Sequence, residues 1–106
     1  MKKISVVLAT YNEEKNLEMC LDSVVDFADE MVVVDGSSMD KTREIAKKKY
    51  KAKVIKTTNK PNFHINKQMA MDAATGELIL QLDADEVVDA ELKKFILKIA
   101  KYNDLR

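Results

Sequence analysis

The sequence predicts an α/β fold in which helices cover both faces of a mainly parallel sheet of about four strands. Two observations support this. Short apolar segments rich in β-branched residues alternate with segments whose apolar residues recur at helical spacing. Polar and acidic residues also follow three of the apolar segments directly. Because ligands bind beyond the carboxyl ends of strands in such sheets, we expect one domain of 106 residues with a site at a single edge.

The four expected strands are short, apolar and bounded by turn or cap residues. They cover residues 4–9, 31–34, 53–56 and 77–82. The first is rich in β-branched residues and is expected to be buried on both faces. Connections between parallel strands are right-handed crossovers, so a helix is expected between each pair.

The expected helices are recognised by an apolar stripe and by residues suited to their ends. They cover residues 13–27, about 40–49, 64–74 and a last segment after Asp89. Asn12, Ser38 or Asp40, and Asp89 are expected to begin the first, second and last of these. Gly76 is expected to end the third as a left-handed cap. The lysine-rich run at residues 47–51 is interpreted as a solvated helix end, with a role at phosphate or a membrane surface as the less favoured alternative.

The composition excludes several classes of protein. Lys plus Arg and Asp plus Glu both total 18, so the net charge is zero, which disfavours nucleic acid as the main partner. A single cysteine excludes an internal disulfide framework. No apolar run approaches the length of a membrane span, and the N-terminal segment lacks a signal-peptide cleavage site. We therefore expect a cytoplasmic location, and leave association with the inner face of the membrane open.

The most informative motif lies at the end of the fourth expected strand. The apolar run 78–82 is followed by Asp83, Asp85 and Glu86, three carboxylates within four residues. Such groups repel one another unless a cation lies between them, and oxygen ligands suit Mg²⁺ or Mn²⁺. We interpret Asp83 and Asp85 as a metal–diphosphate site. The alternative is a strand-end turn in which Asp85 or Glu86 caps the next segment of the chain.

Two further polar segments are expected at the same edge. Residues 10–13 follow the first strand, and residues 35–38 follow the second. Asp35 with Gly36 is by itself also typical of a turn. Because all three segments converge on one edge of a parallel sheet, together they favour a ligand site over separate turns.

These residues resemble a known family. The ordered segments 6–13, 32–38, 73–77 and 82–86 resemble the nucleotide-sugar-binding half of family 2 glycosyltransferases, which have the GT-A fold. Residues 27–30 and 83–86 look most like the branch that adds sugars to lipopolysaccharide cores. The resemblance covers essentially the whole chain and implies a Rossmann-like GT-A half.

The resemblance also implies roles for individual residues. Thr10, Tyr11 and Glu13 would line the nucleoside pocket, and Asp35 would hydrogen-bond the base. Tyr11 offers a flat apolar face to a base.

At the metal motif, Asp83 would lie by the ribose and the metal, and Asp85 would ligate the Mg²⁺ or Mn²⁺ that bridges the diphosphate. His64, Asn66 and Lys67, near the start of the third helix, are candidates for contact with the phosphate or the donor sugar.

The implied activity is transfer of a hexosyl group from a nucleotide-diphosphosugar to a saccharide or lipid-linked acceptor, with inversion, in cell-envelope polysaccharide biosynthesis. Family members normally continue past the metal motif into the half that supplies the acceptor site and the catalytic base. The chain is therefore expected to be truncated. The alternative is a non-catalytic nucleotide-sugar-binding module that needs a partner chain, and self-association or a partner subunit is left open.

A haloacid-dehalogenase-like phosphatase is set aside because its motif follows the first strand rather than the fourth. A dinucleotide dehydrogenase is excluded because only two glycines are present.

Overall fold

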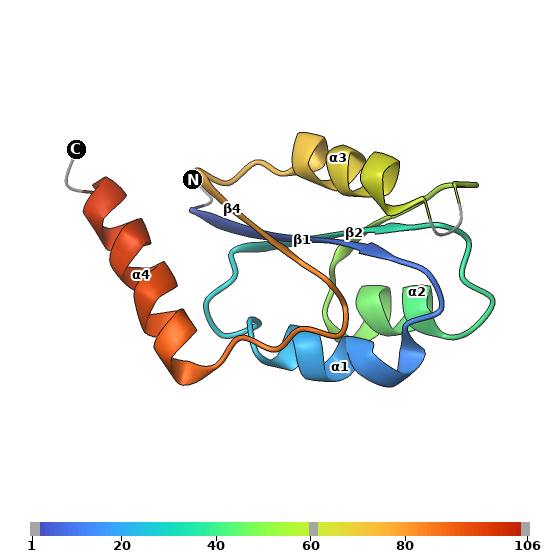
Figure 1. Ribbon diagram of the computed structural model, residues 1–106, viewed down its shortest axis with the longest axis horizontal. Helices are drawn as coiled ribbons and strands as arrows, with labels where there is room; N and C mark the ends of the chain where they lie inside the picture. The colour runs from blue at the N-terminus through green and yellow to red at the C-terminus, as the bar shows by residue number, and fades with distance from the viewer. Residues whose placement is uncertain (1–2, 60–61, 105–106) are drawn as a thin grey trace.

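The computed structural model describes residues 3–59 and 62–104. Its strands are β1 (Ile4–Thr10), β2 (Glu30–Asp35), β3 (Lys53–Lys56) and β4 (Leu78–Leu82). They form one sheet in the order β3-β2-β1-β4, and every neighbouring pair is parallel (Figure 1). This confirms the predicted α/β class and the parallel sheet.

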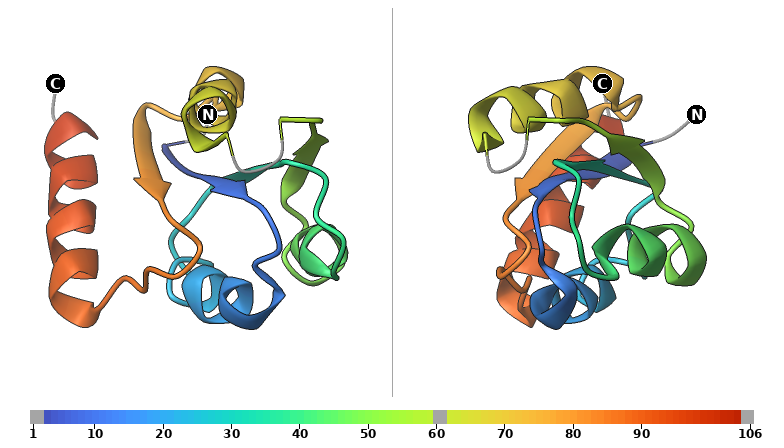
Figure 2. Two further views of the ribbon diagram at one scale, coloured as in Figure 1. Left: turned by 45° about the vertical axis from the view of Figure 1, so that its right-hand side comes forward. Right: turned by 90° about the vertical axis from the view of Figure 1, so that its right-hand side faces the viewer.

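The helices form two layers and one outlying element. They are α1 (Glu14–Asp22), α2 (Thr42–Glu44), the π-helix η1 (Ile45–Lys49), α3 (Phe63–Ala73) and α4 (Ala90–Asp104). Helices α1 and α2 lie below the sheet in Figure 1 and α3 lies above it, while α4 stands beyond β4 (Figures 1 and 2). In the described part of the chain, no helix combines the length and the apolar character that a membrane span requires.

Strand β1 is the centre of the core, because all seven of its residues are buried. Alternate side chains of a strand point to opposite faces. Val6 and Leu8 accordingly pack in one cluster with Leu17 of α1, whereas Val7 packs in a second cluster with Ala70 of α3. Helices on both faces therefore explain why this strand is buried along its whole length.

The register of the sheet brings the strand ends together. Thr10 of β1 pairs with Asp35 of β2, which in turn pairs with Lys56 of β3. Leu8 pairs with Leu82, the last residue of β4. The polar segments that follow β1, β2 and β4 therefore leave the sheet along one edge, as the sequence predicted.

The start of α1 differs from the prediction. Asn12 does not cap the helix: it has a φ of 55°, and its Oδ1 accepts a hydrogen bond from the N–H of Met39 at 2.7 Å. The cap comes from the neighbouring loop, where Asp40 Oδ2 accepts from the Glu14 N–H and Glu14 Oε1 accepts from the Lys41 N–H, both at 3.1 Å. Each loop thus satisfies backbone donors of the other.

Helix α1 is also shorter than predicted, ending at Asp22 instead of residue 27. Ser23 Oγ donates to the Cys20 carbonyl at 2.6 Å and accepts from the Val88 N–H at 3.0 Å. The side chain of Ser23 therefore satisfies a carbonyl at the helix end and fastens that end to the segment before α4.

Gly76 is not a left-handed cap, because neither glycine has a positive φ. Helix α3 ends instead through Ala74, which is extended at φ −74° and ψ 142°. A Cβ on Gly76 would lie 2.5 Å from Ser5 Oγ and 2.9 Å from Ser5 N. The glycine is required because the chain entering β4 passes against β1, and its N–H donates to Ser5 Oγ at 2.8 Å.

Helix α4 begins as predicted, since Asp89 Oδ1 accepts from the Leu92 N–H at 2.8 Å. Its expected apolar face is only partly covered. Ile96 is 4% exposed, but Leu92 and Phe95 are 40% and 60% exposed. Leu92 and Phe95 instead line a hollow of about 170 Å³ between α4 and β4, so part of the apolar face of α4 stays exposed.

We predict that Gly76→Ala destabilises the fold by about 1–3 kcal/mol, because the new methyl group overlaps Ser5 and well-packed regions resist added volume. Chemical denaturation of both proteins would measure the difference. Adding Ser5→Ala should not restore the stability, since the contact with the Ser5 backbone N remains and the Gly76 N–H loses its acceptor. Unchanged stability of Gly76→Ala would contradict the close approach.

Candidate functional site

A pocket of about 220 Å³ lies at the carboxyl ends of β1 and β4, beside the start of α3. Its lining residues are Ala9, Glu13, Phe63, Lys67, Asp83, Ala84 and Asp85. Four separate parts of the chain contribute: the end of β1, the segment before α1, the first two turns of α3 and the turn after β4. The structure therefore brings the acidic motif together with Glu13 and Lys67, as the convergence of strand ends predicted.

The turn after β4 holds the acidic motif in place. The Asp83 N–H donates to Glu86 Oε1 at 2.7 Å, and the Glu86 N–H donates back to the Asp83 carbonyl at 2.9 Å. Asp83 keeps 54% of its side chain exposed, and its Oδ1 lies 3.0 Å from Lys67 Nζ. Asp85 is exposed. Glu86 thus orders the turn, while the carboxylates of Asp83 and Asp85 stay accessible.

Glu13 experiences the charge of this motif. Burial raises the pKa of its carboxyl group, and the negative charges of Asp85, Asp40 and Asp83 raise it further, against a lowering hydrogen bond from Asn16. A raised carboxyl pKa means that the ionised form is disfavoured where it stands. The pocket therefore has an excess of negative potential that a cation would relieve.

The same negative potential acts on Cys20, which lies beneath the acidic motif. Burial, followed by the charges of nearby carboxylates, raises the pKa of its thiol to about 12. Those carboxylates are Glu86, Asp85, Asp83 and Glu13. The Cys20 thiol lies 3.7 Å from the Asp83 carbonyl and is fully buried, which fits the core position that its place on the α1 stripe indicates.

Asp35 lies at the end of β2 with no exposed surface. Its Oδ1 accepts from Thr10 Oγ1 at 2.7 Å and Ser38 Oγ at 2.6 Å, and its Oδ2 accepts from the Ser38 N–H at 2.7 Å and Arg43 Nη1 at 2.9 Å. Burial by itself raises the pKa of Asp35, but these hydrogen bonds outweigh it, and the pKa lies below its usual value. A base N–H would have to replace one of these donors to reach Asp35, and Thr10 is equally buried.

The remaining predicted residues divide between the site and its support. Tyr11 is half-buried just after β1. Asn66 is buried, and its Oδ1 accepts from Thr57 Oγ1 at 3.0 Å and Asn59 Nδ2 at 2.9 Å. His64 is exposed on α3 and does not line the pocket. Of the three candidates on α3, only Lys67 reaches the pocket.

Sequence reasoning missed Arg43 and Phe63. Arg43 is a single cation in a very short helix, and only the packing of α2 beside β2 brings it to Asp35. Phe63 begins α3 and lines the pocket. An aromatic residue directly before the candidate contacts at residues 64–67 was the one signal that could have suggested it.

The carboxylates of the acidic motif do not by themselves make up a complete set of metal ligands. Within residues 3–59 and 62–104, no group of three or more His, Cys, Asp or Glu side chains is arranged to hold a metal ion. Asp83 and Asp85 nevertheless offer exposed carboxylate oxygens in a region of negative potential. This donor set fits a hard divalent cation that takes its other ligands from a phosphate group or water.

Comparison with known proteins identifies the family. A sequence profile of glycosyl transferase family 2 matches residues 5–105. The chain is 34% identical over 99 residues to the SPbeta prophage-derived glycosyltransferase SunS of Bacillus subtilis, a match that covers 92% of this chain and 24% of SunS. The chain belongs to glycosyl transferase family 2.

Solved structures support the same conclusion. Residues 1–349 of Staphylococcus aureus TarS, crystallised with UDP, match with a TM-score of 0.76 and 31% identity over 95% of this chain and 33% of that chain. Glucosyl-3-phosphoglycerate synthase from Mycobacterium tuberculosis, crystallised with Mn²⁺ and UDP-glucose, matches with a TM-score of 0.64 and 30% identity. That match covers 81% of this chain and 34% of the synthase chain. The chain thus has the fold of part of a GT-A enzyme and spans about a third or less of these relatives.

We predict that Asp35→Asn costs about 3 kcal/mol at pH 7, because an amide nitrogen would face donors that now bind a buried carboxylate. Since the folded pKa of Asp35 lies below its unfolded value of about 3.9, its stabilising contribution is present above that pH. This contribution is lost as the pH falls through the folded pKa. Urea denaturation from pH 7 to pH 3 should therefore show a difference between the two proteins that narrows in acid.

Asp72→Asn is the matched control, because Asp72 is exposed on α3 and bonds Gln68 of the same helix at the surface, where solvent screens the interaction. The free energy of unfolding of the control should remain close to that of the wild type at every pH. A difference for Asp35→Asn that stays constant down to pH 3 would contradict the role assigned to the Asp35 charge.

Proposed function

We propose that this chain forms the donor-binding part of a glycosyltransferase that moves a sugar from a nucleotide-diphosphosugar to an acceptor. One observation carries the proposal: in a member of this family, Asp83, Asp85, Glu13 and Lys67 meet in one pocket at the carboxyl edge of the sheet. Ligand sites of open α/β sheets lie at this edge. The TarS complex with UDP and the synthase complex with UDP-glucose support a nucleotide-sugar donor.

Asp83 and Asp85 are proposed to hold Mg²⁺ or Mn²⁺, which the Mn²⁺ complex of the synthase supports. Ions of this kind usually bind one or two carboxylates together with substrate phosphates. When bound, the ion would neutralise charge that develops on the diphosphate leaving group. Lys67, now paired with Asp83, is placed to donate to a phosphate oxygen in the same pocket.

The nucleoside is proposed to lie over Tyr11, between Glu13 and Asp83, whose side chains keep accessible surface. Thr10 and Asp35 lie beneath this site and do not contact the nucleoside. Asp35 bonds both Thr10 and Ser38, and so holds the turn after β2 against the end of β1. This assignment differs from direct contact with the base, because both oxygens of Asp35 already accept two hydrogen bonds each.

A donor-binding module without its own catalytic base is the second candidate. The observation that favours it is that the carboxylates lining the pocket, Glu13, Asp83 and Asp85, are all assigned to the nucleoside or the metal. In this case, another polypeptide or a further segment would supply the base and bind the saccharide or lipid-linked acceptor. The hexosyl and inverting character, the role in cell-envelope polysaccharide and any self-association belong to the same proposal.

We predict that one nucleoside diphosphate, tested among UDP, GDP, CDP and dTDP, raises the melting temperature only when Mn²⁺ or Mg²⁺ is present. Ligand at 100 times its dissociation constant should stabilise the fold by about 2.7 kcal/mol. Asp85→Asn should abolish the metal-dependent part of the shift, because it removes a charged ligand. Differential scanning fluorimetry measures both effects.

Asp72→Asn is the matched control, since Asp72 is exposed on α3, bonds Gln68 and lies outside the pocket. It should behave like wild type. A folded protein that shows no shift with any of the nucleotides would argue against donor binding. Release of the sugar from a nucleotide-sugar, assayed with the same preparation, would separate an active transferase from a binding module.

A further inference from the structure

A second pocket lies away from the acidic motif. It has a volume of about 520 Å³ and lies between β3 and the segment formed by α2 and η1. Its lining residues are Arg43, Glu44, Lys47, Lys48, Ala52, Val54 and Lys56, and we call it the basic pocket. It shares no lining residue with the pocket beside Asp83.

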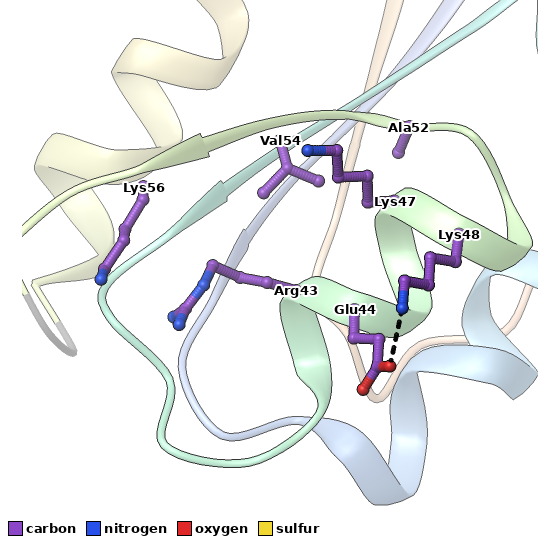
Figure 3. A pocket seen from close by; sticks show the side chains of 7 residues that line it. All are labelled: Arg43, Glu44, Lys47, Lys48, Ala52, Val54 and Lys56. Carbon is purple, nitrogen blue, oxygen red and sulfur yellow. Dashed lines mark hydrogen bonds and ion pairs between the residues drawn. The ribbon is translucent and has the colours of Figure 1, made fainter.

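Cationic side chains reach the basic pocket from two directions. Figure 3 shows Lys47 reaching from the helical segment toward Val54 on the strand, and Arg43 extending toward the side on which Lys56 lies, while Lys48 turns back to Glu44. Four cationic residues thus surround a hollow whose one acidic lining residue is Glu44.

Arg43 pairs with Asp35 and Lys48 with Glu44, which leaves two of these four cations without an ion-pair partner in the described part of the chain. Glu44 pairs with Lys48 at 3.1 Å. Within residues 3–59 and 62–104, neither Lys47 nor Lys56 has an ion-pair partner. In a chain with zero net charge, such a local excess over a concave surface concentrates anions.

Arg43 is held in place by two hydrogen bonds. Its Nη1 donates to Asp35 Oδ2 and to the Ser38 carbonyl, both at 2.9 Å, and 32% of its side chain stays exposed. A guanidinium group fixed in this way presents its remaining N–H groups with little further loss of side-chain freedom. Planar guanidinium donors match the oxygens of phosphate.

We propose that the basic pocket binds the phosphate group of a ligand, through Arg43, Lys47 and Lys56, at a site separate from the proposed nucleotide site. The volume of the pocket suits a phosphorylated small molecule, because ligand pockets usually measure about 300–1,000 Å³. Ala52 and Val54 provide an apolar wall for the rest of such a ligand. The phosphate could belong to a free metabolite or to a lipid headgroup, which share this chemistry.

A phosphate bound here would also contact the network behind the nucleotide site. Arg43 bonds both Asp35 and Ser38, which hold the turn after β2. The basic pocket and the carboxyl edge of the sheet are thus connected through one guanidinium group.

The test is a titration of the ¹⁵N-labelled full chain with inorganic phosphate at constant ionic strength, followed by ¹H–¹⁵N correlation spectra. Shifts should concentrate at residues 43–56. The variant Lys47→Gln with Lys56→Gln should weaken binding by about tenfold, which corresponds to about 1.4 kcal/mol. Arg43 is left unchanged because its loss would also disturb Asp35.

The control is Lys15→Gln with Lys94→Gln, which removes the same charge from exposed residues outside the pocket. It should bind phosphate like wild type. Equal weakening in both double variants, or shifts spread over the whole surface, would overturn the proposal in favour of general charge attraction. Asp85→Asn should leave phosphate binding intact, so failure of the nucleotide site is distinguishable from failure of this one.

Co-sedimentation with vesicles separates the two sources of phosphate. Binding to vesicles that contain phosphatidylglycerol but not to pure phosphatidylcholine, lost in the Lys47 and Lys56 variant, would identify a lipid headgroup. Saturable binding of inorganic phosphate without vesicle binding would identify a free phosphorylated ligand. If the protein binds neither phosphate nor anionic vesicles, the proposal is wrong.

Discussion

The hydrogen bonds of the buried Asp35 carboxylate hold together the loops at the carboxyl ends of the strands. The carboxylate accepts hydrogen bonds from β1 through Thr10, from the following turn through Ser38, and from α2 through Arg43. A buried charge is costly unless all its hydrogen-bonding capacity is used, so these elements can only meet in one arrangement. The same network positions the neighbouring loop, since Ser38 Oγ also accepts from the Asn12 N–H at 2.7 Å.

The loops after β1 and β2 therefore hold each other in place. The Glu13 N–H donates to Thr42 Oγ1 at 2.9 Å, and Asp40 and Glu14 each accept from a backbone N–H of the other loop. Such exchanged caps satisfy donors that helix starts otherwise leave open. They also fix where Glu13 stands relative to the loop after β2.

Although the net charge of the chain is zero, the protein has two regions of opposite charge. Carboxylates gather where β1 and β4 end, and their potential raises the pKa values of Glu13 and Cys20, in both cases in addition to the effect of burial. Cations gather beside β3, at the other side of the sheet order. A single chain can hold both because the parallel sheet separates its edge strands β3 and β4 by two further strands. The exposed Leu92 and Phe95 of α4 add an apolar region beside β4.

The sequence by itself determined the α/β class, the parallel sheet, the family and the convergence of three polar segments. These follow from periodicity and local motifs, which are properties of neighbouring residues. The tertiary structure decided that Gly76 serves a close approach to Ser5, and that Asn12 bonds Met39 instead of capping α1. It also brought Arg43 to Asp35 and assembled the basic pocket from α2, η1 and β3. Each of these contacts joins residues from different elements. Such contacts depend on how the elements pack, and they do not appear as a periodic pattern in the sequence.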